Sequence, residues 1–152
     1  MAIFVINEWL WADSSGENGL VAQREVLDLV VTLASSYDQI VVIIGSAFDQ
    51  KAWACCKSPN PLALTLARTF VASIRQNSDR CRLLDAEAVA VLPDDLASSI
   101  KADDHYLVRA QLTVASATLI TTDGPLQEIV RQAGLPCLTR EEFIARYNTA
   151  GG

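Results

Sequence analysis

Short apolar runs separated by amphipathic stretches are the feature that most limits how this chain can fold. Three runs are rich in branched residues and too short to be helices: 2–6 (AIFVI), 40–44 (IVVII) and 118–121 (TLIT). Strands that are apolar at every position are buried on both faces, which is typical of a parallel sheet. Between them, 21–35 and 102–115 carry apolar residues at helical spacing. The alternation predicts an α/β domain: a three-layer α/β/α sandwich with a mostly parallel sheet of four or five strands.

Capping signals divide the rest of the chain. Asn60 before Pro61 predicts a helix from residue 61 to about 75, because asparagine caps helices and proline suits the first helical position. Thr139 and Glu142 form a capping box that starts a last helix, predicted to end near Tyr147. Within 78–97 either 82–84 or 88–92 can supply another strand, and both interpretations stay open. The remaining predictions are a loop at 14–19 and a frayed tail at 151–152.

Composition bounds the class of protein. The chain has 152 residues, of which 51% are hydrophobic and 20% charged, enough for one domain with a core. No apolar run approaches the roughly 18 residues of a membrane helix and the first residues lack signal-peptide features, so we expect a soluble cytoplasmic protein. A net charge of -6 disfavours non-specific binding to phosphate backbones. The four cysteines lack zinc or disulfide spacing, which predicts buried reduced thiols.

Polar residues follow each apolar run directly. In an open parallel sheet, ligands bind beyond the carboxyl ends of the strands. The residues expected at that edge are Asn7, Glu8, Ser46, Asp49, Thr122 and Asp123. Asp103 and Asp104 open the helix that leads into the third run, so they are expected over the same edge.

Crowded carboxylates predict a cation site. Such groups repel and raise one another's pKa unless a cation neutralises them, and their hard oxygens suit magnesium or manganese. A divalent ion there can polarise a phosphodiester and lower the pKa of a bound water, which predicts metal-dependent phosphodiester hydrolysis. The alternative is that Asp104 merely caps a helix, Asp123 starts the next one and Glu8 is solvated.

The segment KADDHYLVRAQLTVASATLITTDGPLQEIV, residues 101–130, resembles the second half of a PIN domain. This is the fold of many bacterial toxin ribonucleases and RNA-processing nucleases. In that family an aspartate opens a helix with a small residue six positions on, and the next strand ends in Thr-x-Asp. Asp104, Ala110 and 121–123 (TTD) match this pattern. The resemblance implies a single PIN-like domain over 1–150 and a ribonuclease that uses magnesium or manganese.

The first half departs from the family pattern. PIN domains usually end their first strand in an aspartate, followed two residues later by Asn or Ser, whereas this chain has Asn7 and Trp9. The family's glutamate after the second strand has no counterpart, and Asp49 is the only acid near that place. The resemblance therefore carries Asp104 and Asp123 over as ligands of one ion rather than two. Glu8 or Asp49 would complete the shell, with Asn7 orienting a water.

Four further residues are expected to contact substrate. Ser46 would present the amino end of the following helix to a phosphate, with Lys51 as counter-charge, although a plain strand-to-helix turn explains the same residues. Thr122 and Asp103 are placed in the same group. The predicted substrate is single-stranded RNA, and the tryptophans near this edge, Trp9 among them, either stack on its bases or pack in the core.

Two other functions remain open. A degenerate PIN-like module would bind RNA or a protein partner without cutting, as Asn7 and the missing glutamate suggest. A phosphoryl-transfer domain of the receiver or haloacid-dehalogenase type fits less well, because the first strand lacks a paired-acid ending. The family resemblance also suggests a homodimer, a protein antitoxin or regulator as partner, and no membrane contact.

Overall fold

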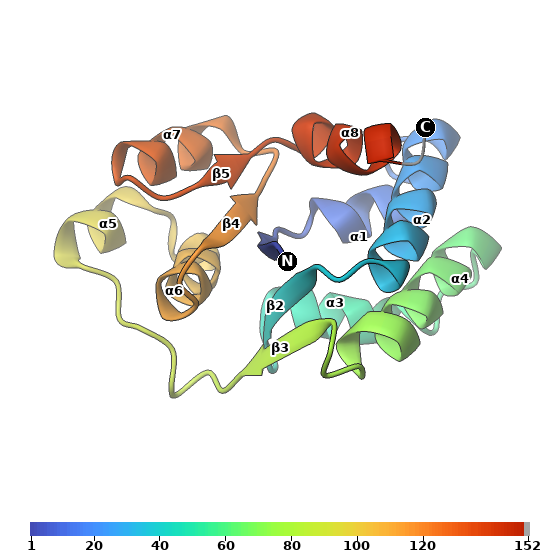
Figure 1. Ribbon diagram of the computed structural model, residues 1–152, viewed down its shortest axis with the longest axis horizontal. Helices are drawn as coiled ribbons and strands as arrows, with labels where there is room; N and C mark the ends of the chain where they lie inside the picture. Colours follow the sequence, from blue (N-terminus) through green and yellow to red (C-terminus); the bar gives the residue numbers. More distant parts are fainter. Residues whose placement is uncertain (151–152) are drawn as a thin grey trace.

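One five-stranded sheet organises the molecule (Figure 1). The computed structural model describes residues 1–150, and the predicted tail at 151–152 lies outside the described residues. All strand pairs are parallel, which confirms the predicted sheet. The strands lie in the order β3-β2-β1-β4-β5 and comprise β1 (Ile3–Ile6), β2 (Gln39–Ile43), β3 (Cys81–Leu84), β4 (Ala117–Ile120) and β5 (Cys137–Leu138).

Helices cover both faces of this sheet, as the three-layer prediction required (Figure 1). The α-helices are α1 (Trp9–Ser14), α2 (Leu20–Ser35), α3 (Ala47–Cys55), α4 (Pro61–Phe70), α5 (Asp94–Ser99), α6 (His105–Thr113), α7 (Gly124–Gln132) and α8 (Arg140–Ala150). Along β1, Phe4 and Ile6 pack into the core beneath α1, α2 and α8, whereas Ile3 and Val5 pack into the core beneath α6 and α7. Alternate residues of β1 thus pack into two different cores, so every residue of the strand is apolar.

The capping signals are borne out. Asn60 accepts a hydrogen bond from the Ala63 backbone N–H (3.0 Å), and α4 continues through a π-helical turn, η1 (Val71–Arg75), to the predicted end. The Thr139 N–H donates to Glu142 (3.0 Å) and the Glu142 N–H donates to Thr139 (3.1 Å), which is the capping box at the start of α8.

Two segments resolve or correct sequence expectations. Of the two strand candidates within 78–97, the first is right, since β3 pairs with β2. The helix expected over 102–115 begins instead as a 3-10 turn, η2 (Ala102–Asp104), and α6 ends at Thr113. The four cysteines are free thiols, as predicted, but only Cys81 and Cys137 are buried, whereas Cys55 and Cys56 are half-buried. No helix within residues 1–150 is both long and apolar enough to cross a bilayer.

Strand β1 is central in both position and packing. Its neighbours are β2 on one side and β4 on the other, with Ile3 opposite both Gln39 and Ala117. The strand order therefore reverses at β1, and a crevice forms beyond the carboxyl ends of β1 and β4. The residues that leave these two strands, 7–8 and 121–123, consequently face one another across the crevice.

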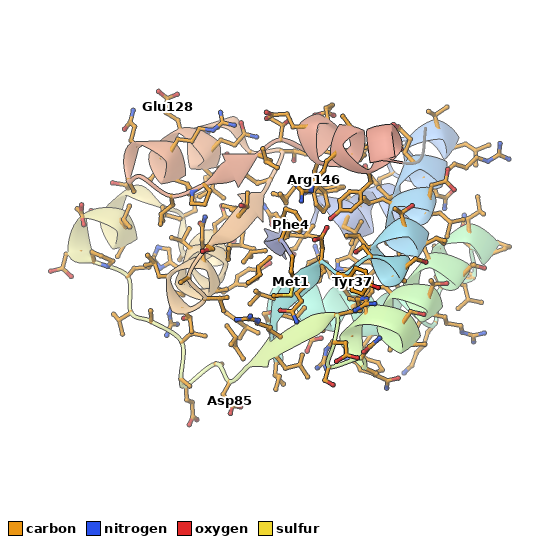
Figure 2. All side chains as sticks on the ribbon, in the orientation of Figure 1. Met1, Phe4, Tyr37, Asp85, Glu128 and Arg146 are labelled. Carbon is orange, nitrogen blue, oxygen red and sulfur yellow. The ribbon has the colours of Figure 1, made fainter. Side chains whose placement is uncertain are left out.

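An aromatic cluster fastens α8 to the sheet. The rings of Phe4 and Phe143 lie 4.8 Å apart in an edge-to-face arrangement, and Tyr147 packs against both. The guanidinium of Arg146 covers the Phe4 ring at 5.4 Å (Figure 2). Because α8 carries Arg140 at its first position, this cluster also fixes one wall of the crevice.

Truncating the fully buried Phe143 tests this anchoring. Phe143→Ala should lower the free energy of unfolding by about 3 to 5 kcal/mol, because it leaves a cavity against Phe4. The measurement is urea denaturation followed by circular dichroism. Val91→Ala, at a side chain that is 83% exposed, should change it by less than about 0.5 kcal/mol. Equal effects of the two substitutions would show that α8 is not anchored this way.

Candidate functional site

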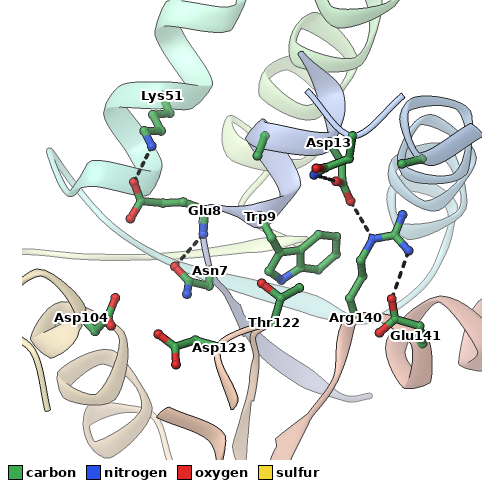
Figure 3. A pocket seen from close by; sticks show the side chains of 13 residues that line it. Asn7, Glu8, Trp9, Asp13, Lys51, Asp104, Thr122, Asp123, Arg140 and Glu141 are labelled. Atoms are coloured by element: carbon green, nitrogen blue, oxygen red, sulfur yellow. Dashed lines mark hydrogen bonds and ion pairs between the residues drawn. The ribbon is translucent and has the colours of Figure 1, made fainter. Parts of the chain in front are cut away.

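A pocket of about 700 Å³ opens beyond the carboxyl ends of β1 and β4 (Figure 3). Six of the residues predicted from the sequence line it: Asn7, Glu8, Lys51, Asp104, Thr122 and Asp123. They come from the ends of two strands, from α3 and from the start of α6. The topology thus brings together side chains that are more than 110 positions apart in the chain.

Asp104 and Asp123 form an acidic wall of this pocket. Both also line a smaller adjoining pocket of about 80 Å³. Burial raises the pKa of Asp104, and repulsion from the charges of Asp123 and Glu8 raises it further. The carboxylate of Asp104 is therefore destabilised by its surroundings.

The two aspartates differ in what else holds them. Asp123 caps α7 by accepting a hydrogen bond from the Leu126 N–H (3.1 Å) through Oδ1. Asp104 occupies the N-cap position of α6, but its side chain makes no capping hydrogen bond. The alternative interpretation, that these acids only cap helices, therefore accounts for Oδ1 of Asp123 but not for the side chain of Asp104.

Asn7 ties the end of β1 to the end of β4. Its Oδ1 accepts a hydrogen bond from the Glu8 N–H (2.7 Å), and its Nδ2 donates to Thr121 Oγ1 (3.0 Å). The same hydroxyl oxygen accepts from the Asp123 N–H (3.2 Å). The amide of Asn7 is therefore fixed in orientation beside the acidic wall.

Glu8 reaches the pocket but pairs with a base. Its Oε1 lies 2.8 Å from Lys51 Nζ, and its Oε2 accepts a hydrogen bond from the Tyr106 hydroxyl (3.3 Å). Figure 3 shows Glu8 turned toward Lys51, with Asp104 and Asp123 on the other side. Within the part of the chain that the structure describes, no three Asp, Glu, His or Cys side chains are grouped closely enough to hold a metal ion.

Asp49 does not join the pocket, contrary to expectation. Arg75 donates from Nε to Oδ1 (2.8 Å) and from Nη2 to Oδ2 (3.2 Å), and the Gly45 N–H also donates to Oδ2 (2.9 Å). Burial alone raises the pKa of Asp49, but these bonds and the charge of Arg75 outweigh it, so the pKa is lowered. The Asp49 carboxylate therefore stabilises the contact between α3 and η1.

The phosphate cradle predicted around Ser46 is occupied by the protein itself. The Ser46 hydroxyl accepts a hydrogen bond from the Asp49 N–H (3.3 Å), and the Gly45 N–H is used by the Asp49 carboxylate. Gly45 has a φ of 78°, a left-handed conformation that suits glycine. The plain strand-to-helix turn is therefore the better description. Asp103 is exposed on η2 and does not line the pocket.

Sequence reasoning missed the opposite wall of the pocket. Arg140 donates from Nε to Asp13 Oδ2 (2.6 Å), and its guanidinium lies 5.8 Å from the ring centre of Trp9. Trp9 is buried and donates from Nε1 to the Ile120 carbonyl (3.0 Å), so it packs rather than stacks on a base. Asp13 and Arg140 are 127 residues apart, and no local pattern marks them as partners.

The pocket carries more negative than positive charge. Its basic residues are Lys51 and Arg140, and both are ion-paired. Its acidic residues are Glu8, Asp13, Asp104, Asp123 and Glu141. Such a pocket attracts a cation and opposes a bare phosphate.

No family model matches this chain, and a search of curated proteins finds no match to it.

Removing the Asp49 carboxylate should cost stability and leave the pocket unchanged. Asp49→Asn leaves the Arg75 guanidinium without its counter-charge, so the free energy of unfolding at pH 7 should fall by about 3 kcal/mol. The wild-type pair stabilises above the ordinary pKa of 3.8 and is lost as the pH falls through the lower folded value, so the difference should shrink in acid. Urea unfolding at several pH values measures it, with the exposed Glu87→Gln as control. A stable Asp49→Asn protein would contradict the assignment.

Asp104→Asn should instead raise stability in metal-free buffer. The folded pKa of Asp104 is raised, so the native state binds more protons than the unfolded state and wild-type stability falls as pH rises above 3.8. At pH 7 the variant should gain less than about 1 kcal/mol, since the site is half-exposed and screened. Near pH 3 the gain should vanish. Destabilisation at pH 7 in thermal melts would argue against repulsion at the acidic wall.

Proposed function

We propose that this protein is a magnesium- or manganese-dependent ribonuclease of the PIN-like type that acts on single-stranded RNA. The observation that carries the proposal is the acidic wall, where burial and the charges of Asp123 and Glu8 raise the pKa of Asp104. Folding has brought like charges together at the edge of the sheet where ligands bind. A bound cation removes this repulsion, which is a reason for such a wall to exist.

The donors at the wall fit a hard divalent cation. Within residues 1–150, the Asp104 carboxylate has no hydrogen bond or ion pair and Asp123 uses only Oδ1 in its cap, which leaves oxygen atoms for an ion. Bound there, magnesium or manganese would polarise a phosphodiester and lower the pKa of a water. Asp104 and Asp123 would hold the ion, and Asn7, fixed in orientation, would position the attacking water.

A catalytically silent binding module is the second candidate. The observation that favours it is the pairing of Glu8 with Lys51, together with Asn7 where PIN domains usually have an aspartate. In this case Lys51 neutralises Glu8 in place of a metal, and the surface binds RNA or a protein regulator without cleaving it. The two functions differ in whether a divalent ion stabilises the fold.

Manganese should therefore raise the melting temperature of the wild type. At ten times its Kd, an ion that binds only the folded state should raise Tm by about 3 to 6 °C. Asp123→Asn should abolish the shift while it keeps the α7 cap, since asparagine caps as well as aspartate. Asp103→Asn removes the same charge outside the pocket and should keep the shift. An unchanged wild-type melting curve at millimolar manganese would favour the binding module.

Cleavage of single-stranded RNA tests the activity itself. With manganese, the wild type should cut, and Asp104→Asn should lower the rate about a hundredfold or more, the usual cost of losing one group that stabilises charge in the transition state. Asp103→Asn again provides the control, because it lies next to Asp104 but is exposed. If Asp104→Asn cut as fast as Asp103→Asn, the acidic wall would not be the active site.

A further inference from the structure

Side chains from two other helices engage both oxygens of Glu8. Lys51 of α3 pairs with Oε1 at 2.8 Å (Figure 3), and Tyr106 of α6 donates to Oε2 at 3.3 Å. The Lys51 side chain is 56% exposed and that of Glu8 is 26% exposed, so their ion pair lies at the mouth of the pocket. Glu8 is thus held by a base on one side and by a half-buried hydroxyl on the other.

The same residue lies beside the acidic wall. Glu8 lines one pocket together with Asp104 and Asp123. Glu8 is therefore near enough to influence a cation at Asp104 and Asp123, yet its oxygens face Lys51 and Tyr106. This orientation explains why the wall offers two acids rather than three among the described residues.

We propose that Lys51 competes with a divalent cation for Glu8. The inference rests on the proposed metal binding at Asp104 and Asp123. A partly exposed lysine–glutamate pair is weak, whereas a divalent cation prefers carboxylate oxygens, so Glu8 exchanges Lys51 for the ion and becomes its third oxygen ligand. The ammonium group so released lies at the pocket mouth on a flexible stem, where it binds a phosphate of the RNA. Lys51 thus sets the metal affinity first and contacts the substrate second.

Competition for Glu8 must be distinguished from simple electrostatic repulsion between a lysine and the cation. Any nearby lysine repels a cation, whether or not it pairs with Glu8. Lys101 supplies the control, because its charge also acts on Asp104, in the direction that lowers the pKa, and it lines the adjoining pocket. Competition requires the Glu8 carboxylate, whereas simple electrostatic repulsion does not.

The experiment is isothermal titration of manganese chloride into five proteins at one ionic strength: wild type, Lys51→Met, Lys101→Met, Glu8→Gln and the Lys51→Met/Glu8→Gln double variant. Lys51→Met should bind manganese about fivefold more tightly than wild type, the upper range for losing an exposed ion pair. Lys101→Met, and Lys51→Met in the Glu8→Gln background, should change affinity by about twofold or less in salt. Metal-free melting curves confirm that each variant folds.

Each outcome decides the proposal. An equal gain from Lys51→Met with and without the Glu8 carboxylate, or an equal gain from Lys101→Met, overturns the competition and leaves the metal site of the proposed function intact. Manganese binding to Lys51→Met but not to wild type supports the competition and removes metal-dependent activity from the native protein. No binding to any of the five proteins overturns both the competition and the proposed function.

Discussion

The parallel pairing of β1 with β4 is the constraint on which the site depends. Residues Ile3 to Ile6 run in register with Ala117 to Ile120, and the pairing continues past the strands through the Asn7 N–H, which donates to the Ile120 carbonyl (3.0 Å). The indole of Trp9 donates to the same carbonyl. Parallel register makes both chains leave the sheet at one edge, so Asn7 and Glu8 meet Asp123 there.

Ion pairing then determines which carboxylates have a basic partner and which do not. Asp49 is neutralised by Arg75, and Asp13 is neutralised by Arg140, so both carboxylates stabilise contacts between helices. Glu8 pairs with Lys51 at the pocket mouth, in a more exposed setting. Asp104 instead keeps a raised pKa, because burial and the neighbouring carboxylates outweigh the opposing charge of Lys101. The pattern separates acids that stabilise contacts between helices from the two acids that we propose as cation ligands.

The architecture was accessible from the sequence because its signals are local. Apolar residues such as 40–43 are buried whichever strand they pair with, and the caps at Asn60 and Thr139 act within four residues. Sequence reasoning failed where a partner is distant. Nothing in the sequence near Asp49 indicates that Arg75, 26 residues further on, will donate hydrogen bonds to both of its carboxylate oxygens.

The sequence by itself determined the layered α/β fold and the set of polar residues at the carboxyl edge of the sheet, because apolar periodicity and helix caps depend on neighbours along the chain. Only the tertiary structure decided which of those residues share a pocket and which form ion pairs. Asp104 and Asp123 share a wall, Asp49 turns away to Arg75, and Glu8 faces Lys51. The physical reason is that the state of a carboxylate depends on burial and on charges a few ångströms away, and folding brings those charges from remote parts of the chain.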